Sequence, residues 1–124
     1  MKKGKYLITG CAGFIGSHLV NFLFKNYKVI LVDDLSEGSK SKLPKLLQKK
    51  LIKRRIQDIE SFNFRGIKGI FHLAAQSSVP ISVKDFYQSS SNNLNSSLKV
   101  FEIAKKFSIP VVYASSSAVY GNLP

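Results

Sequence analysis

Three glycines at fixed spacing, Gly10, Gly13 and Gly16, constrain the fold of this chain more than any other feature of its sequence. They follow at once on the short apolar run Tyr6-Leu7-Ile8-Thr9, which is typical of a buried β-strand. Gly10 permits a tight turn after the strand, Gly13 lets the backbone approach a ligand, and Gly16 lets the next helix pack closely. Such a loop offers free backbone N–H groups and the positive end of a helix dipole to the pyrophosphate of a dinucleotide. An ordinary glycine-rich turn is the alternative.

An acidic pair closes the next predicted strand. Apolar residues at helical spacing from Phe14 predict a helix that ends near Asn26, and the continuous apolar run at 29–32 predicts a second buried strand. Asp33 follows, 17 residues after the last of the three glycines. A carboxylate here can accept hydrogen bonds from both hydroxyls of an adenine ribose and repels a 2′-phosphate, which favours NAD over NADP. A turn or a helix cap is the alternative role for Asp33 and Asp34.

The rest of the sequence continues the alternation of strands and helices. Further strands are expected at 51–56, 69–73 and 111–114, a short helix around 43–47, a helical turn near 59–64 and a long helix at 86–107. The first half of the long helix is rich in Ser and Asn, so packing must stabilise it. This alternation predicts an α/β fold: a parallel sheet of about five strands, wound with helices on both faces.

Composition restricts the remaining classes of protein. A chain of 124 residues can bury roughly two thirds of its unfolded surface, which suits one domain. Its one cysteine, Cys11, cannot form an internal disulfide, and no run of 18 apolar residues marks a membrane span. We therefore expect a cytoplasmic protein without a membrane partner, and we predict no metal site. Nothing at the N-terminus marks it for export.

The net charge of +12 comes from 19 Lys and Arg residues against 7 Asp and Glu residues. Such a charge suits an anionic partner. Sixteen of these cations are lysines, however, and only 49–50 and 53–55 are clustered. Specific readout of nucleic acid relies more on Arg and on aromatic stacking. We therefore expect a solvated basic surface rather than a nucleic-acid interface.

Five ordered motifs together resemble the extended short-chain dehydrogenase/reductase family, and most closely its nucleotide-sugar epimerases and dehydratases, especially UDP-hexose 4-epimerases. The motifs are the glycine spacing, Asp33-Asp34-Leu35-Ser36, Gln57-Asp58-Ile59, His72-Leu73-Ala74-Ala75-Gln76 and Ser115-Ser116-Ser117-Ala118-Val119-Tyr120-Gly121. The resemblance runs from about Lys5 to Gly121. It implies a Rossmann-type fold, NAD as cofactor and a nucleotide sugar as the substrate of the complete protein.

The resemblance also implies roles for individual positions. Asp58 and Ile59 would contact the adenine, small residues after His72 would let NAD lie against the backbone, and Asn93 would steady the loops of the site. His72 itself is expected to be structural. Solvated loops and caps are the alternatives for Asp58, for Asn93 and for the serines. The implied cofactor residues are Gly10, Gly13, Phe14, Ile15, Gly16, Asp33, Asp34, Asp58, Ile59, Leu73, Ala74, Ala75, Gln76 and Asn93.

Serines are the residues implied for substrate and chemistry. Ser78, with Ser77 and Ser82 beside it, falls where such epimerases begin to contact the sugar nucleotide. Ser116 matches the family's catalytic Ser/Thr, whose hydroxyl shares the substrate's hydroxyl proton with a catalytic tyrosine.

The Tyr-x-x-x-Lys pair of the family is the main departure. The fourth residue after each of the five tyrosines is Gly10, Leu31, Ser91, Ser117 or Pro124, and never Lys. Positioned proton transfer contributes about 100- to 10,000-fold to a rate. We therefore expect residues 1–124 to be a partial, truncated NAD-binding domain that lacks the C-terminal substrate domain and is inactive alone.

Two other functions stay open from the sequence. The chain could be a basic Rossmann-like module that binds nucleic acid or a protein partner, or a remnant without function. In the remnant, the fifth strand would be an exposed sheet edge, through which we expect self-association.

Overall fold

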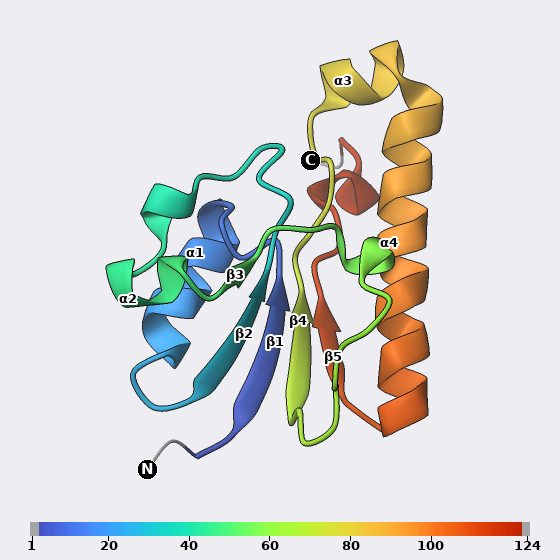
Figure 1. The fold of residues 1–124 in the computed structure, drawn as a ribbon. Helices are drawn as coiled ribbons and strands as arrows, with labels where there is room; N and C mark the ends of the chain where they lie inside the picture. The colour runs from blue at the N-terminus through green and yellow to red at the C-terminus, as the bar shows by residue number, and fades with distance from the viewer. Residues whose placement is uncertain (1–2, 123–124) are drawn as a thin grey trace.

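Five parallel strands form one sheet in the order β3-β2-β1-β4-β5 (Figure 1). The structure is a computed structural model and describes residues 3–122. The strands are β1 (Lys5–Thr9), β2 (Lys28–Val32), β3 (Leu51–Ile52), β4 (Gly69–His72) and β5 (Val111–Tyr113). The α-helices are α1 (Phe14–Leu23), α2 (Lys45–Gln48), α3 (Val79–Lys84) and α4 (Phe86–Phe107), and the 3₁₀ turns are η1 (Lys40–Lys42), η2 (Ile56–Asp58) and η3 (Ser117–Tyr120). The predicted doubly wound α/β fold is confirmed.

Two hydrophobic cores lie on opposite faces of this sheet, because successive side chains of a strand point to opposite sides. Leu7 of β1 is fully buried on the face covered by α4, where it shares a core with Val100. The next residue, Ile8, pairs with Leu31 of β2 and lies in the second core with Val20 of α1. Each such buried aliphatic side chain stabilises the fold by about 2 kcal/mol.

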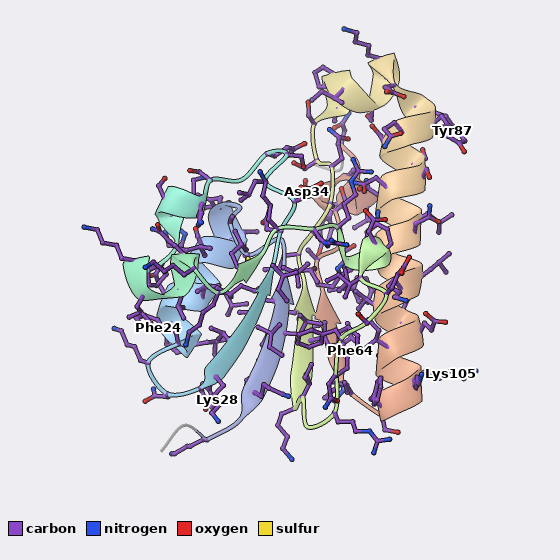
Figure 2. The ribbon with its side chains drawn as sticks, viewed as in Figure 1. Phe24, Lys28, Asp34, Phe64, Tyr87 and Lys105 are labelled. Carbon is purple, nitrogen blue, oxygen red and sulfur yellow. The ribbon has the colours of Figure 1, made fainter. Side chains whose placement is uncertain are left out.

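The segment after β2 departs most from the predicted elements. The third strand, expected at 51–56, ends at Ile52, because the chain turns there and the Arg54 N–H donates to the Ile52 carbonyl at 2.9 Å. The helical turn expected near 59–64 is wrong. A 3₁₀ turn ends at Asp58, and Ile59 and Phe64 then enter the core beneath α4 in non-helical backbone (Figure 2).

Helix α3 is not among the predicted elements, since the serines at 77–82 are typical of a loop. It is short, and Pro80 lies in its first turn, where a missing N–H costs nothing. Helix α4 spans the predicted 86–107. The Asp85 carboxylate caps it by accepting the Gln88 N–H at 3.2 Å, and two of its serines, Ser89 and Ser96, are buried. Helix α1 ends at Leu23, three residues before the predicted Asn26.

Candidate dinucleotide-binding site

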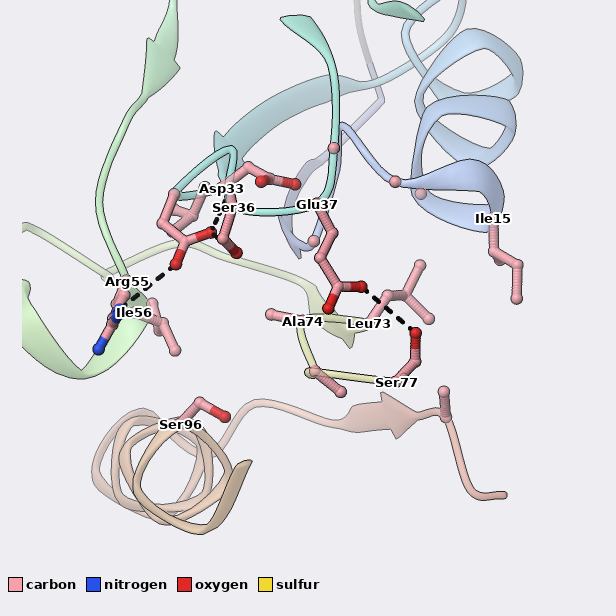
Figure 3. A pocket seen from close by; sticks show the side chains of 18 of the residues that line it. Ile15, Asp33, Ser36, Glu37, Arg55, Ile56, Leu73, Ala74, Ser77 and Ser96 are labelled. Atoms are coloured by element: carbon pink, nitrogen blue, oxygen red, sulfur yellow. Dashed lines mark hydrogen bonds and ion pairs between the residues drawn. The ribbon is translucent and has the colours of Figure 1, made fainter. Parts of the chain in front are cut away.

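A cavity of about 530 Å³ opens where the parallel strands end, which is where α/β sheets bind ligands (Figure 3). The glycine loop, the end of β2, the turn η2, the segment after β4 and one side of α4 form its walls. Of the predicted cofactor residues, it is lined by Gly10, Gly13, Phe14, Ile15, Gly16, Asp33, Asp34, Leu73, Ala74 and Ala75. The structure therefore brings most of the sequence-derived set to one place.

The glycine loop leaves no room for side chains at two positions. Gly10 has φ +67°, and a Cβ there would lie 2.6 Å from the Ala74 nitrogen. A Cβ on Gly16 would overlap the carbonyl oxygen of Gly10. The loop therefore packs directly on the segment after β4 and on the start of α1, and the first turn of α1 faces the cavity.

Asp33 fixes this loop from the end of β2. It is 8% exposed, its Oδ2 accepts the Ala12 N–H at 2.8 Å, and its Oδ1 accepts the Leu35 N–H at 2.8 Å. The carboxylate thus ties the glycine loop to the turn after β2. Because a carboxylate offers about four acceptor positions, it can still accept hydrogen bonds from a ligand.

Asp34 turns towards the outer wall of the cavity. It accepts the Ser36 N–H at 2.9 Å and forms an ion pair with Arg55, with 3.3 Å between Nε and Oδ2 (Figure 3). Partial burial opposes ionisation, but the hydrogen bonds from Ser36 and the Arg55 guanidinium outweigh it and lower the pKa of Asp34. Asp34 is therefore ionised at neutral pH.

The thiol of Cys11 takes no part in the chemistry of the cavity. Its side chain is fully buried, and burial, together with the neighbouring Asp33 carboxylate, raises its pKa to about 12. A thiol of this kind is a poor nucleophile at neutral pH.

Asn93 holds the segment after β4 against α4. Its Oδ1 accepts the Gln76 N–H at 2.8 Å, and its Nδ2 donates to the Gln76 carbonyl at 3.1 Å. This reciprocal pair fixes the Gln76 backbone. The loop-steadying role that the resemblance implies for Asn93 stays a prediction. Asn93 and Gln76 themselves do not line the cavity.

His72 has a structural role, as expected. It is 6% exposed, its Nδ1 lies 2.7 Å from the Thr9 hydroxyl, and its Nε2 lies 3.2 Å from the Ser97 hydroxyl. The Ala74 N–H also donates to Thr9 Oγ1 at 3.3 Å. A neutral ring thus links β4 to α4 beside the cavity, and burial lowers the pKa of His72.

This lowered pKa predicts a loss of stability in mild acid. The unfolded chain protonates His72 near pH 6.5 whereas the native chain resists protonation, so the free energy of unfolding should fall as pH drops below about 6.5. Urea unfolding between pH 7.5 and 5.5 measures this slope. His72→Gln should remove the dependence and His18→Gln should keep it. An unchanged slope in His72→Gln would contradict the assignment.

Four further predicted site residues lie outside the lining of the cavity. Asp58 is exposed and Ile59 is buried in the core, so η2 presents its Ile56 and Gln57 to the cavity instead. Ser78 precedes α3, and its neighbour Ser77 takes the place at the wall. Ser116 is exposed and accepts the Ala118 N–H at 3.2 Å, while Ala114 and Ser115 line the cavity. Their roles stay predictions.

Part of the cavity wall consists of residues that were not predicted as site residues. Glu37 reaches across from the turn after β2, and the Ser77 hydroxyl donates to its Oε2 at 3.4 Å (Figure 3). The other unforeseen lining residues are Val32, Ser36, Gly38, Lys42, Arg54, Arg55, Ile56, Gln57, Asn92, Ser96, Ala114 and Ser115. Ser36, Gln57 and Ser115 belong to the quoted motifs although no site role was predicted for them, and no local pattern marks the others.

The described residues contain neither a membrane-spanning helix nor a cluster of metal ligands. Within residues 3–122, no helix combines the length and the apolar character that crossing a membrane requires. In the same range, His, Cys, Asp and Glu side chains form no group of three that could hold a metal ion.

Comparison with known proteins gives consistent matches. The profile of the NAD dependent epimerase/dehydratase family matches residues 6–124. A putative UDP-glucose 4-epimerase of Methanocaldococcus jannaschii is 37% identical over 119 residues, covering 93% of this chain and 39% of that protein. The structure of a UDP-N-acetylglucosamine 4-epimerase from Methanobrevibacter ruminantium M1, in complex with UDP-N-acetylmuramic acid, has a TM-score of 0.90 at 39% identity. The match covers 100% of this chain and 41% of that one.

The UDP-glucose 4-epimerase of Thermus thermophilus, solved in complex with NAD, matches 97% of this chain over 40% of its own length, with a TM-score of 0.85 and 32% identity. The chain thus spans about 40% of the length of such relatives. The family profile, in contrast, covers almost the whole chain, glycine loop included. The chain belongs to the NAD dependent epimerase/dehydratase family.

Proposed function

We propose that this chain is the NAD-binding part of a nucleotide-sugar 4-epimerase-like protein. The single observation that carries the proposal is the cavity that joins the glycine loop, Asp33 and residues 73–75 after β4. The family supports NAD as the cofactor, and the similar epimerases support a nucleotide sugar as the substrate class.

The residues present fit a dinucleotide. The absence of side chains at Gly10, Gly13 and Gly16 leaves backbone open to a pyrophosphate, beside the first turn of α1. Asp33 stands at the end of β2, where it can accept ribose hydroxyls. Further out, Gln57 lines the cavity with a buried Oε1 that has no hydrogen-bond partner within residues 3–122. A donor on a bound group would relieve this unsatisfied acceptor.

Bound NAD would supply hydride acceptance and return at the sugar carbon. For its part, the protein would orient the cofactor through Asp33 and the segment that Asn93 fixes. In the complete protein, the hydroxyl of Ser116 would share the proton of the substrate hydroxyl. None of the tyrosines in this sequence has a Lys four residues on, so we propose that residues 1–124 alone do not turn over substrate.

Isothermal titration with NAD tests cofactor binding directly. We expect heat with millimolar NAD and no heat for Gly13→Val, because a side chain there would stand between the loop and the pyrophosphate. The backbone of Gly13 has φ −73°, but a Cβ there would lie 3.3 Å from the Gly10 carbonyl oxygen, so thermal unfolding must first show that the variant is folded. Gly4→Val, far from the cavity, should bind like the parent. No heat from the folded parent protein would overturn the proposal.

We also propose that β5 mediates self-association. It lies at one edge of the sheet, and its Val112 and Tyr113 are each 60% exposed. Unpaired edges with apolar side chains favour pairing with another strand. Light scattering after size exclusion should show a mass that rises with concentration, and Val112→Lys should lower it. A monomer at all concentrations would contradict this.

A further inference from the structure

The most uneven distribution of charge in the chain lies between residues 40 and 55. This stretch of sixteen residues, called the basic segment below, holds eight of the 19 cations and no acidic residue. They are Lys40, Lys42, Lys45, Lys49, Lys50, Lys53, Arg54 and Arg55. The sequence alone suggests only two small clusters here, at 49–50 and 53–55.

The fold places most of these cations on one side of the molecule. The elements η1, α2 and β3 of the basic segment lie at the β3 edge of the sheet, and the chain after β3 then crosses the ends of the strands towards α4 (Figure 1). All eight side chains are exposed, while Leu43 and Leu47 anchor the segment in the core beside α1. The buried leucines therefore hold in place the backbone that carries the cations.

Within the described residues, carboxylates neutralise almost none of this charge. Across residues 3–122, the ion pairs are Arg55 with Asp34 and Lys99 with Glu102. Seven cations of the basic segment thus have no carboxylate partner in the described part of the chain. Like charges held close together repel one another, and a polyanion laid across them would relieve this repulsion while releasing its own counterions.

The side chains around these cations indicate the kind of polyanion. The basic segment contains no aromatic residue on which a base could stack, and six of its eight cations are lysines, which contact phosphates without choosing bases. Leu46, at 62% exposed, is its one strongly exposed apolar residue. One leucine offers little apolar area to insert into a membrane surface. A regular array of phosphodiesters fits these features better than a lipid surface does.

We propose that the basic segment binds the phosphate backbone of double-stranded nucleic acid without sequence selection. Three cations of the segment, Lys42, Arg54 and Arg55, also line the cavity, whereas Lys45, Lys49 and Lys50 do not. The latter three therefore allow this function to be tested apart from the cofactor site. If the net charge alone caused binding, the same change of charge anywhere on the surface would weaken it equally. We expect instead that only changes within the basic segment weaken binding strongly.

Fluorescence anisotropy with a labelled duplex of random sequence tests the proposal. The patch variant is K45E/K49E/K50E, and the matched control is K25E/K105E/K106E, which changes three exposed lysines outside the segment by the same charge. At 50 mM salt we expect the patch variant to lose on the order of 100-fold in affinity and the control less than about threefold. The slope of log K against log salt should become shallower by about 2.7 in the patch variant, since each phosphate that a lysine neutralises adds about 0.9 to it.

A neutral variant, a lipid comparison and an NAD titration complete the test. The neutral variant K45Q/K49Q/K50Q should lose affinity in the same direction and covers the case in which the charge reversal does not fold. Equal losses in the patch and control variants would overturn the proposal, as would tighter binding of the parent to phosphatidylserine vesicles than to the duplex. Retained NAD heat in a patch variant that no longer binds the duplex would separate this function from the cofactor site.

Discussion

Replacing Gly16 by Ala should destabilise the protein by about 3 kcal/mol or more and lower its melting temperature by about 10 °C. The added Cβ would overlap the Gly10 carbonyl oxygen and approach Cys11 Cα to 2.9 Å. All of these atoms belong to backbone, which cannot move aside as the end of a flexible side chain can. Relief would require α1 to shift away from β1, and the buried Val20 and Leu23 would lose their packing.

Thermal and urea unfolding measure this effect. Gly4→Ala is the matched control, because its Cβ would meet only Lys68 and Tyr6 side-chain atoms at 3.5 Å. We expect the control to remain within about 0.5 kcal/mol of the parent. A Gly16→Ala protein that melts within about 2 °C of the parent would show that the helix can yield at this point.

Features that depend on neighbouring residues were predictable from the sequence. The strand, glycine loop and helix from Lys5 to Leu23 follow from an apolar run, a fixed glycine spacing and a helical period, all contained in nineteen adjacent residues. Asp33 was predictable for the same reason, since it comes directly after an unbroken apolar strand.

Features that depend on packing between distant segments were not predictable in this way. Residues 51–64 alternate weakly, and the core beneath α4 decides that Ile59 and Phe64 point inward while Gln57 faces the cavity. Helix α3 is too short to show a helical period. The same holds for the basic segment, because the sequence shows its charges but not that β3 and α2 bring them to one edge.

Asp33→Ala should have the second large effect, and it should act on stability and on cofactor binding together. The carboxylate accepts the N–H groups of Ala12 and Leu35, both at 2.8 Å, in a position that is 8% exposed. Hydrogen bonds to a charged group contribute about 1.5–3 kcal/mol each, and buried N–H groups left without an acceptor are costly. We expect a loss of about 3 kcal/mol in the free energy of unfolding.

Asp33→Asn should lose nearly as much of the free energy of unfolding, because its NH₂ group would face one of the two N–H donors. Asp34→Ala is the control for stability and should cost about 1 kcal/mol or less, since Asp34 is only partly buried and its partners Ser36 and Arg55 are exposed to water, which can replace the carboxylate. Chemical denaturation distinguishes the three variants. Near-parental stability of Asp33→Ala would mean that the loop holds its shape without the carboxylate.

The same variants separate the two roles that Asp33 is proposed to have. If the carboxylate also accepts ribose hydroxyls, titration calorimetry below the melting temperature should show NAD affinity reduced by on the order of 100-fold in Asp33→Ala. The affinity for NADP should fall less, because removal of the negative charge also removes its repulsion of a 2′-phosphate. An unchanged ratio of NAD to NADP affinity, with stability lost, would leave Asp33 as a support of the glycine loop that does not select the cofactor.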